Sequence, residues 1–387
     1  MTSDFSFKKL SEVKGADVDT IFAGKRVLLR LDLNVPIADG AVSDGFRITQ
    51  SLETVNFLRK AGAKIIVVAH LENKEYPSLE IVCKFAQQYF PATFVSDPWS
   101  TEGVAALVNL KNGDVAIVEN IRKWEGEKKN DPEFARHLAA LADIYVNEAF
   151  SVAHRPHASI VGVPTLLPSY AGFNFEQEVA HLSRAFNPPH PYLFVLGGIK
   201  FETKAPLIKK FLGLADNVFV GGALSDDLFK AKGYNIGDSI HSDQDFGFAE
   251  MLSNPKLILP TDLVVATSAD KKVTKLANEL QNGDQAWDSG AQTLVNLSEY
   301  IKKAKFILWN GPLGQFETGY TEGTFALARM IADASAESIV GGGDTLASIE
   351  ALKLNDKFTF ISTAGGAMLD FLAEGTLVGI KALENSK

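Results

Sequence analysis

A run of five apolar residues ends in two glycines in Tyr192–Lys200, which reads YLFVLGGIK. The run is short enough for one buried strand, and the glycines mark a tight turn after it. The same pattern recurs along the chain, with a longer segment of helical period between runs. Apolar strands alternating with helices are typical of parallel sheets covered on both faces, so the sequence predicts an α/β fold. The predicted strands are Arg26–Asp32, Lys64–His70, Asp114–Glu119, Asp143–Asn147, Tyr192–Leu196, Asn217–Val220, Leu257–Ala266, Lys305–Trp309, Ser338–Val340 and Lys357–Ser362.

Composition excludes several classes of protein. The chain has 387 residues, 46% of them hydrophobic, and a formal net charge of −9. These values are ordinary for a globular protein and argue against disordered, collagen-like and coiled-coil proteins. An acidic chain with no basic block is a poor candidate for general nucleic-acid binding. The single cysteine, Cys83, is expected to be a buried small hydrophobe.

The sequence also bears on location. Its longest aliphatic run, Ile65–Val68, is far too short to span a bilayer, and Met1–Gly15 has no apolar core of signal-peptide length. We therefore expect a cytoplasmic protein without membrane partners.

The two halves of the chain differ in the residues that come directly after the predicted strands. Arginine and histidine end the first four, whereas pairs or triplets of glycine end most of the later ones. A Pro-rich stretch, Asn187–Pro191, separates the halves and comes after the helical-looking run Phe175–Phe186. The sequence predicts two Rossmann-like lobes at residues 1–172 and 191–374, joined by a hinge helix and linker at 173–190.

The glycine-rich ends of the second half indicate an anion site. A glycine turn that opens a helix presents free backbone N–H groups at the positive end of the helix dipole. Asp344, beside such a turn, offers a hard oxygen for Mg²⁺, or is simply a helix N-cap.

Lys200 and Lys204 are four residues apart, on one face at the start of a predicted helix, where an anion between them would offset their repulsion. A solvated surface role for both lysines is the alternative. Walker A and GxGxxG sequences are absent, which argues against the common nucleotide folds.

The polar ends of the first half suit a small polyanion. Guanidinium groups clamp carboxylates and phosphates, and Asp32 could recognise a hydroxyl on the same ligand. Each arginine taken alone is better explained by a surface ion pair, whereas three of them at one edge favour a ligand. A zinc site at His154–His157 lacks a third ligand. The residues concerned are Asp32, Asn34, Arg47, His70, Arg122, His154 and Arg155.

Six motifs succeed one another along the chain: Arg30–Pro36 (RLDLNVP), Asn147–Phe150 (NEAF) with Ala153–Arg155 (AHR), Leu196–Lys200 (LGGIK), Trp309–Pro312 (WNGP), Gly341–Thr345 (GGGDT) and Ser362–Gly366 (STAGG). On these motifs the chain resembles the phosphoglycerate kinases nearly end to end. The resemblance implies a monomeric two-lobed enzyme of glycolysis and gluconeogenesis. It would move a phosphoryl group between the carboxyl of 3-phosphoglycerate and the β-phosphate of ADP, with Mg²⁺. It also implies that residues 375–387 return to the N-terminal lobe.

The resemblance assigns roles residue by residue. The acid would be held by Asp32, Asn34, Arg47, His70, Arg122 and Arg155, and Asn73 stands in the same site. Lys200, together with Arg47, would act in catalysis by stabilising the transferring group. The nucleotide would be held by Lys204, Asn310, Glu317, Gly342, Gly343, Asp344 and Thr345, with Asp344 as the metal ligand.

The match has departures. Where the family has His-Leu-Gly-Arg-Pro, this chain reads His70–Lys74 as HLENK, so Asn73 replaces an arginine and Glu72 adds a negative charge. We therefore expect weakened affinity for phosphoglycerate unless Lys74 substitutes. Ala223 and Ala364 replace glycines, and we expect both changes to be harmless. Two alternatives to a phosphoglycerate kinase stay open: an acyl-phosphate kinase for another acid, and a nucleotide-binding protein without catalysis.

Overall fold

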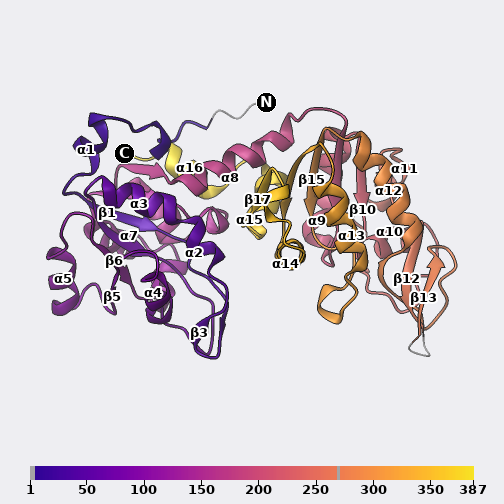
Figure 1. Ribbon diagram of the computed structural model, residues 1–387, viewed down its shortest axis with the longest axis horizontal. Helices are drawn as coiled ribbons and strands as arrows, with labels where there is room; N and C mark the ends of the chain where they lie inside the picture. Colours follow the sequence, from indigo (N-terminus) through magenta and orange to yellow (C-terminus); the bar gives the residue numbers. More distant parts are fainter. Residues whose placement is uncertain (1–4, 268–270) are drawn as a thin grey trace. The chain divides into compact units, whose positions relative to one another are not determined.

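The computed structural model describes residues 5–267 and 271–387. Two compact units account for these residues (Figure 1). The N-terminal unit contains residues 5–180 together with Glu374–Lys387, and the C-terminal unit contains His181–Ala373. Within the described ranges, no helix has the length and apolarity needed to cross a membrane.

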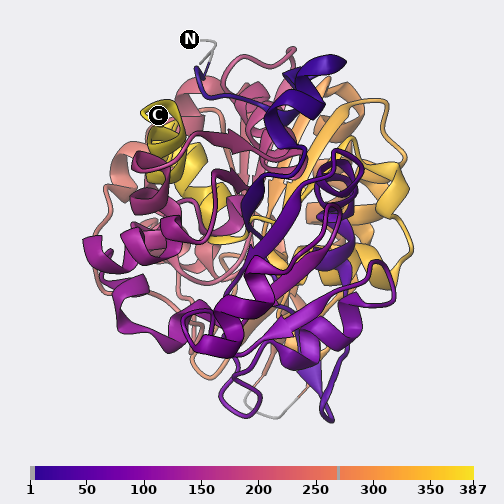
Figure 2. The same ribbon diagram turned by 90° about the vertical axis from the view of Figure 1, so that its left-hand side faces the viewer.

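The N-terminal unit, drawn mainly in indigo and purple in Figure 2, is built on a six-stranded parallel sheet. The order of its strands is β5-β6-β4-β1-β7-β8. Its strands are β1 (Arg26–Arg30), β4 (Lys64–Val68), β5 (Thr93–Val95), β6 (Val115–Val118), β7 (Ile144–Asn147) and β8 (Ser169–Ala171). The central strands are almost entirely buried because helices cover both faces, which explains their continuous apolar sequences. A two-stranded hairpin, β2 (Ile37–Ala38) and β3 (Ala41–Val42), comes after β1.

Helices connect these strands, and their ends obey local sequence signals. Asp131 caps α7 by accepting hydrogen bonds from the N–H groups of Glu133 and Phe134, and Pro132 occupies the first helical position. Cys83 is buried in α4, as predicted. The helices are α1 (Ala16–Phe22), α2 (Phe46–Gln50), α3 (Leu52–Lys60), α4 (Glu80–Ala86), α5 (Thr101–Val108), α6 (Glu125–Lys128), α7 (Pro132–Ala140) and α16 (Val378–Glu384).

The C-terminal unit has a second six-stranded parallel sheet, in the order β11-β10-β9-β15-β16-β17. Its strands are β9 (Tyr192–Leu196), β10 (Asn217–Val220), β11 (Leu257–Ile258), β15 (Phe306–Asn310), β16 (Glu337–Gly341) and β17 (Phe360–Ser362). Numbered within the sheet, the order is 3-2-1-4-5-6, the doubly wound arrangement with a switch point between β9 and β15. The predicted α/β fold with two parallel sheets is confirmed. The helices are α9 (Phe201–Leu214), α10 (Leu224–Ala231), α11 (Phe248–Ser253), α12 (Ala291–Lys303), α13 (Glu322–Ala332), α14 (Gly343–Ala351) and α15 (Gly366–Glu374).

One predicted strand of this unit was wrong. The run Leu257–Ala266 is divided into β11 and β12 (Asp262–Ala266), and Pro260 lies between them. Proline lacks the N–H group that a continuous strand would need for its ladder. β12 instead pairs antiparallel with β13 (Lys272–Leu276) and β14 (Gln285–Ser289), in a small sheet at one end of this unit (Figure 1).

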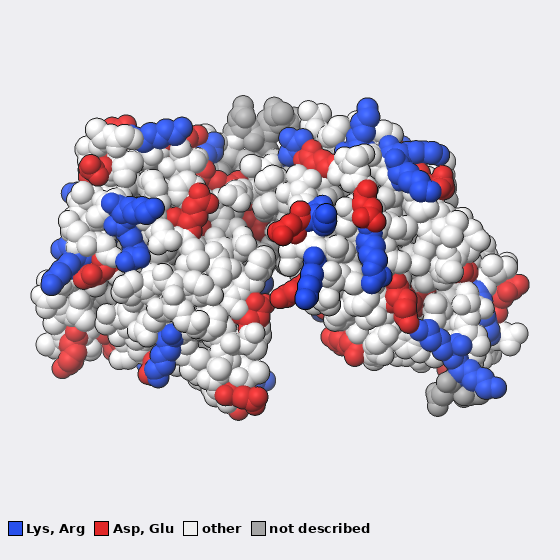
Figure 3. Space-filling view, viewed as in Figure 1, with Lys and Arg blue, Asp and Glu red and all other residues white. Residues whose placement is uncertain are grey.

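Two further segments bear on the chain's organisation. Helix α8 (Phe173–Ser183) continues into a short 3₁₀ turn, Arg184–Phe186, and the division between the units falls after Ala180 within α8. The C-terminal residues pack in the N-terminal unit, where Gly379 N donates to Ala153 O at 2.8 Å. On the face drawn in Figure 3, acidic and basic side chains are interspersed on each unit.

Candidate active site

A cavity of about 440 Å³ opens at the carboxyl ends of the strands of the C-terminal unit. The turns after β9, β10, β15, β16 and β17 all contribute to its lining, so it lies at the switch point between β9 and β15. Ligands bind to open parallel sheets at this place, because the strand order reverses there and leaves a crevice. The predicted residues that line the cavity are Lys200, Lys204, Asn310, Glu317, Gly342, Gly343 and Asp344.

Glycine is required at two of these turns. Gly342 has a φ of 106°, which a residue with a Cβ rarely adopts. Gly311 has a φ of 91°, and a Cβ there would lie 2.6 Å from the carbonyl carbon of Gly197. Because Gly311 has no Cβ, the turns after β9 and β15 can approach each other. Ala223, in contrast, has a φ of −61° and needs no glycine.

The two lysines differ in setting. Lys200 is exposed at the N-cap of α9, and Lys204 lies in the first part of this helix, so the predicted helix start at the two lysines is confirmed. The backbone of Lys200 itself is extended, and the first helical residue is Phe201. Lys204 is partly buried, and its Nζ donates to Gly197 O at 2.5 Å. Burial lowers the pKa of Lys204 to about 8, and attraction to Asp344 opposes this change.

Asp344 and Thr345 lie in the first turn of α14, but their side chains have different surroundings. Gly342 is the N-cap, so Asp344 is not the cap and its side chain lines the cavity. Thr345 is fully buried, and its Oγ1 accepts a hydrogen bond from Gly311 N at 3.1 Å. The hydroxyl of Thr345 therefore fixes the turn after β15.

An apolar wall of the cavity was missed by the sequence reasoning. Trp287 of β14 and Leu263 of β12 line it, and the Trp287 ring stacks on Tyr320 with centroids 5.2 Å apart. The short segment Gln285–Ser289 has no clear alternation, so nothing in the local sequence marks it as a strand that carries an aromatic group to this cavity. A planar ring would fit against this wall while an anion meets the glycine turns.

The carboxyl edge of the N-terminal sheet carries a network of charged groups. Asp32 comes after β1 and forms a close ion pair with Arg47 of α2. Asp32 also accepts hydrogen bonds from Ser151 Oγ at 2.5 Å and from Asn34 N at 3.1 Å. Asp32 and Arg47 are thus brought together, and Arg47 is held by its partner.

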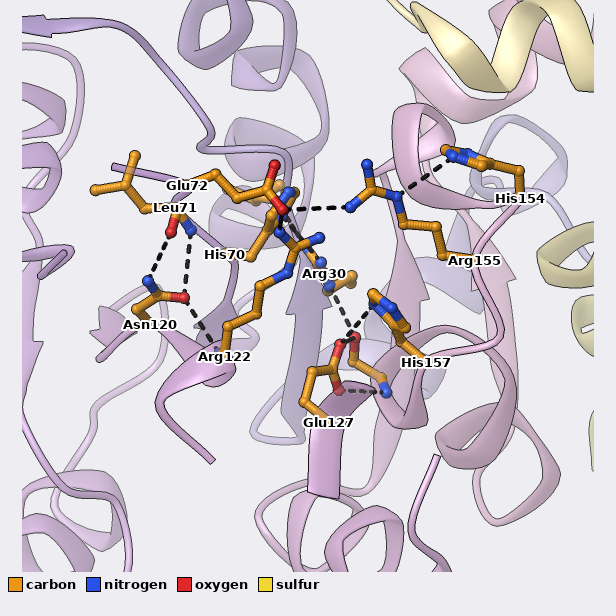
Figure 4. A network of polar contacts seen from close by, with 12 residues as sticks. Arg30, His70, Leu71, Glu72, Asn120, Arg122, Glu127, His154, Arg155 and His157 are labelled. Carbon is orange, nitrogen blue, oxygen red and sulfur yellow. Dashed lines mark hydrogen bonds and ion pairs between the residues drawn. The ribbon is translucent and has the colours of Figure 1, made fainter. Parts of the chain in front are cut away.

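Figure 4 shows a further group of polar side chains in the N-terminal unit, which includes Arg30, His70, Glu127 and His157. Arg30, which the sequence reasoning did not include, is fully buried at the end of β1. It donates to Ser159 Oγ at 3.0 Å and approaches His70 Nδ1 at 3.3 Å. Burial, and secondly the charge of Arg30, lowers the pKa of His70 far below its usual value. Burial also lowers the pKa of His157 to about 4, although Glu127 lies 3.8 Å away. Both imidazoles are therefore neutral at pH 7, and the positive charge of the network comes from its arginines.

Arg122 and Arg155 meet at a single carboxylate. Glu72 forms a close ion pair with Arg122 Nη1, and its Oε1 lies 3.6 Å from Arg155 Nη1 (Figure 4). The Arg122 side chain is 5% exposed, and its Nε and Nη2 have no hydrogen-bond partner among the described residues. Two buried donors of a charged group without partners are costly, and an anion would satisfy them.

A second cavity, of about 710 Å³, lies next to Arg122. Glu72, Asn73 and Lys74 contribute to its lining. The Asn73 side chain is engaged locally, since its Oδ1 accepts from Glu75 N at 3.0 Å and from Tyr76 N at 2.9 Å. Asn73 therefore caps a turn.

Metal binding has limited support from the protein alone. Among residues 5–267 and 271–387, no group of three or more His, Cys, Asp or Glu side chains could hold a metal ion. Asp344 lies beside the glycine turn that opens α14, and Asp288 and Glu317 line other parts of the same cavity. One carboxylate fits Mg²⁺ only where substrate phosphates and water supply the other ligands, which is usual for this ion.

Comparisons with known proteins place this chain in a family. The family model described as phosphoglycerate kinase matches residues 17–375. The chain is 38% identical to a phosphoglycerate kinase of Borreliella burgdorferi (strain ZS7) over 383 residues, covering 94% of this chain and 97% of the relative. It is 38% identical to that of Coprothermobacter proteolyticus over 392 residues, covering 97% and 99%. The solved phosphoglycerate kinase of Coxiella burnetii matches with a TM-score of 0.85 and 33% identity, over 98% of this chain and 100% of that chain. The chain therefore belongs to the phosphoglycerate kinase family of phosphotransferases that use a carboxyl group as acceptor (EC 2.7.2.3).

Proposed function

We propose that this chain catalyses the reversible transfer of a phosphoryl group between 1,3-bisphosphoglycerate and ADP, giving 3-phosphoglycerate and ATP. The observation that supports the proposal is that one chain has two places suited to an anion. One is the glycine-lined cavity of the C-terminal unit, and the other is the arginine network of the N-terminal unit, with its unpartnered Arg122 donors. A protein that only bound nucleotide would have no physical need for the second.

The arginine network would bind the acid. Arg122 and Arg155 would receive its phosphate, because Arg122 offers two buried nitrogen atoms, Nε and Nη2, that have no partners among the described residues. Asp32 would accept a hydrogen bond from the hydroxyl group. Arg47, already oriented by Asp32, would neutralise the reacting carboxylate. Asn34, His70 and Asn73 would border the site.

The glycine-lined cavity would bind the nucleotide. The backbone N–H groups at Gly342 and Gly343 and the ammonium group of Lys204 would meet the phosphates, and Glu317 would accept hydrogen bonds from the ribose. Asp344 would hold Mg²⁺ together with those phosphates. The bound ion would neutralise phosphate charge and orient the transferring group. Asn310 borders the same cavity, and Thr345 would act through the Gly311 turn.

Transfer would be direct and in line, so positioning and charge stabilisation must supply most of the rate. Lys200, exposed at the edge of the cavity, would stabilise the phosphoryl group as it moves. Because the two sites belong to different units, a hinge at residues 173–190 would close them together and exclude water. Orientation of bound reactants is worth roughly 7–11 kcal/mol in favourable cases. We further propose that the enzyme is cytoplasmic and monomeric.

The test is steady-state phosphorylation of 3-phosphoglycerate by ATP, coupled to reduction of the acyl phosphate, with millimolar acid and Mg²⁺. Turnover by the wild type is expected, and its loss in Lys200→Ala with nucleotide binding retained. Lys302→Ala is the matched control, because Lys302 pairs with Glu299 on an exposed face of α12. A wild type that binds nucleotide but does not turn over 3-phosphoglycerate would contradict the proposal. A screen of other acids would then separate an altered substrate from a protein without catalysis.

A further inference from the structure

Glu72 places a negative charge inside the arginine network. Its side chain is half exposed, whereas that of its partner Arg122 is 5% exposed. The same carboxylate oxygen faces Arg155 at 3.6 Å (Figure 4). The carboxylate of Glu72 therefore already occupies part of the surface that these guanidinium groups would offer to a substrate anion.

Hydrogen bonds to the backbone hold both partners of this ion pair. Asn34 Oδ1 accepts from Glu72 N at 2.8 Å. Asn120 Oδ1 accepts from Leu71 N at 3.3 Å and from Arg122 N at 3.2 Å, and Asn120 Nδ2 donates to Leu71 O at 2.8 Å. One asparagine thus ties the segment before Glu72 to the segment that carries Arg122. The ion pair joins two backbones that are held together, unlike a chance contact between flexible side chains.

The other charged groups of the network do not replace Glu72. Glu127 is fully buried and accepts from Ser159 N and Oγ at 2.9 and 2.6 Å. Arg30 is also engaged, with Leu31 O, Ser159 Oγ and His70. Glu72 is the carboxylate that forms ion pairs with both Arg122 and Arg155 in the described part of the chain.

We propose that Glu72 is a specificity-determining residue: an internal carboxylate that competes with the phosphate of the acid substrate for Arg122 and Arg155. The proposal rests on the proposed function, because it concerns the same acid site. With Glu72 in place, Arg122 Nε and Nη2 stay available while Nη1 is taken. An incoming phosphate must displace Glu72 or bind beside it against like-charge repulsion. Since that repulsion grows with the ligand's charge, Glu72 penalises a dianionic phosphate more than a monoanionic group.

The experiment compares the wild type with Glu72→Gln, which keeps the size of the side chain and the backbone hydrogen bonds but removes the charge. Calorimetric titration with 3-phosphoglycerate, and separately with inorganic phosphate, gives the dissociation constants without turnover. Glu80→Gln is the matched control, because Glu80 forms an exposed ion pair with Lys84 in the same unit.

We expect the dissociation constant for 3-phosphoglycerate to fall about tenfold in Glu72→Gln, and the constant for phosphate to fall as well. The KM for the acid should fall in parallel, while kcat and the KM for ATP stay within about twofold. Glu80→Gln should match the wild type.

An unchanged or larger dissociation constant in Glu72→Gln would overturn the inference, because it would mean that Glu72 orients Arg122 and does not compete for it. Tighter binding without turnover would support the competition and count against the proposed function. Turnover by the wild type with an unchanged KM for the acid in Glu72→Gln would support the proposed function and overturn the competition.

Discussion

Lys204 is the residue where stability and function should oppose each other. In the free protein its ammonium group is partly buried against Gly197 O, and burial lowers its pKa from 10.5 to about 8. We expect Lys204→Met to make the free protein more stable at pH 7 and to weaken nucleotide binding. The substitution keeps an unbranched chain of similar length in α9.

The size of the stability gain can be worked out from the pKa. A gap from 10.5 to about 8 corresponds to about 3.4 kcal/mol at about 1.36 kcal/mol per pH unit. Part of the Lys204 side chain stays in contact with solvent, so this value must be discounted. The substitution also removes the hydrogen bond to Gly197 O, which lowers the stability gain by about 1 kcal/mol. The expected net gain is about 1–2 kcal/mol.

The sign of the pH dependence comes from proton counts. Between about pH 8 and pH 10.5 the unfolded chain keeps the Lys204 proton that the folded chain has lost, so the stability of the wild type rises with pH there. The buried charge of Lys204 destabilises the wild type fully below about pH 8, and this destabilisation disappears as the pH approaches 10.5. The advantage of Lys204→Met should therefore shrink above pH 8.

Urea denaturation at pH 7 and pH 9 measures this difference, with Lys209→Met, an exposed lysine of the same helix, as control. Calorimetric titration with ADP and Mg²⁺ should show a dissociation constant about tenfold to a hundredfold larger for Lys204→Met. Wild-type affinity for ADP should itself decline above about pH 8 as the free lysine loses its charge. A Lys204→Met protein that is less stable than the wild type at pH 7 would refute the reasoning from burial.

Two further predictions concern the turns around the sites. Asn73→Arg should lower the dissociation constant for 3-phosphoglycerate about tenfold in calorimetric titration, because it adds a cation to the site. The free energy of unfolding, measured in urea, should fall by about 1 kcal/mol because the hydrogen bonds from Glu75 N and Tyr76 N are lost. An unchanged dissociation constant would contradict the prediction. Thr345→Val should leave Gly311 N without its acceptor. We expect the free energy of unfolding to fall by about 1–3 kcal/mol and the dissociation constant for ADP to rise. If the wild type and the variant had the same free energy of unfolding and the same dissociation constant, this hydrogen bond would not hold the turn.

Local sequence predicted the central strands well because they are buried on both faces. Tyr192–Leu196 and Asn217–Val220 were predicted with the bounds they have in β9 and β10. The edge strands β5 and β8 are three residues long each and were missed, because so short a segment has no periodicity to read. The antiparallel sheet β13-β12-β14 was missed as well. Its pairing depends on which strands meet in space, and the sequence pattern of a single strand does not show this.

The sequence by itself determined that polar and glycine residues end the strands, and therefore that these residues lie at the carboxyl edges of the sheets. The roles of the individual residues there stay predictions. Only the tertiary structure decided which of these groups are already paired. Glu72 meets Arg122 across 50 residues, and Thr345 meets Gly311 across 34. Strand burial is encoded by neighbours in the chain, whereas these contacts depend on how the sheet orders its strands. The ion pairs of Glu72 with Arg122 and Arg155, on which the proposed competition rests, therefore became visible only once the strands were in place.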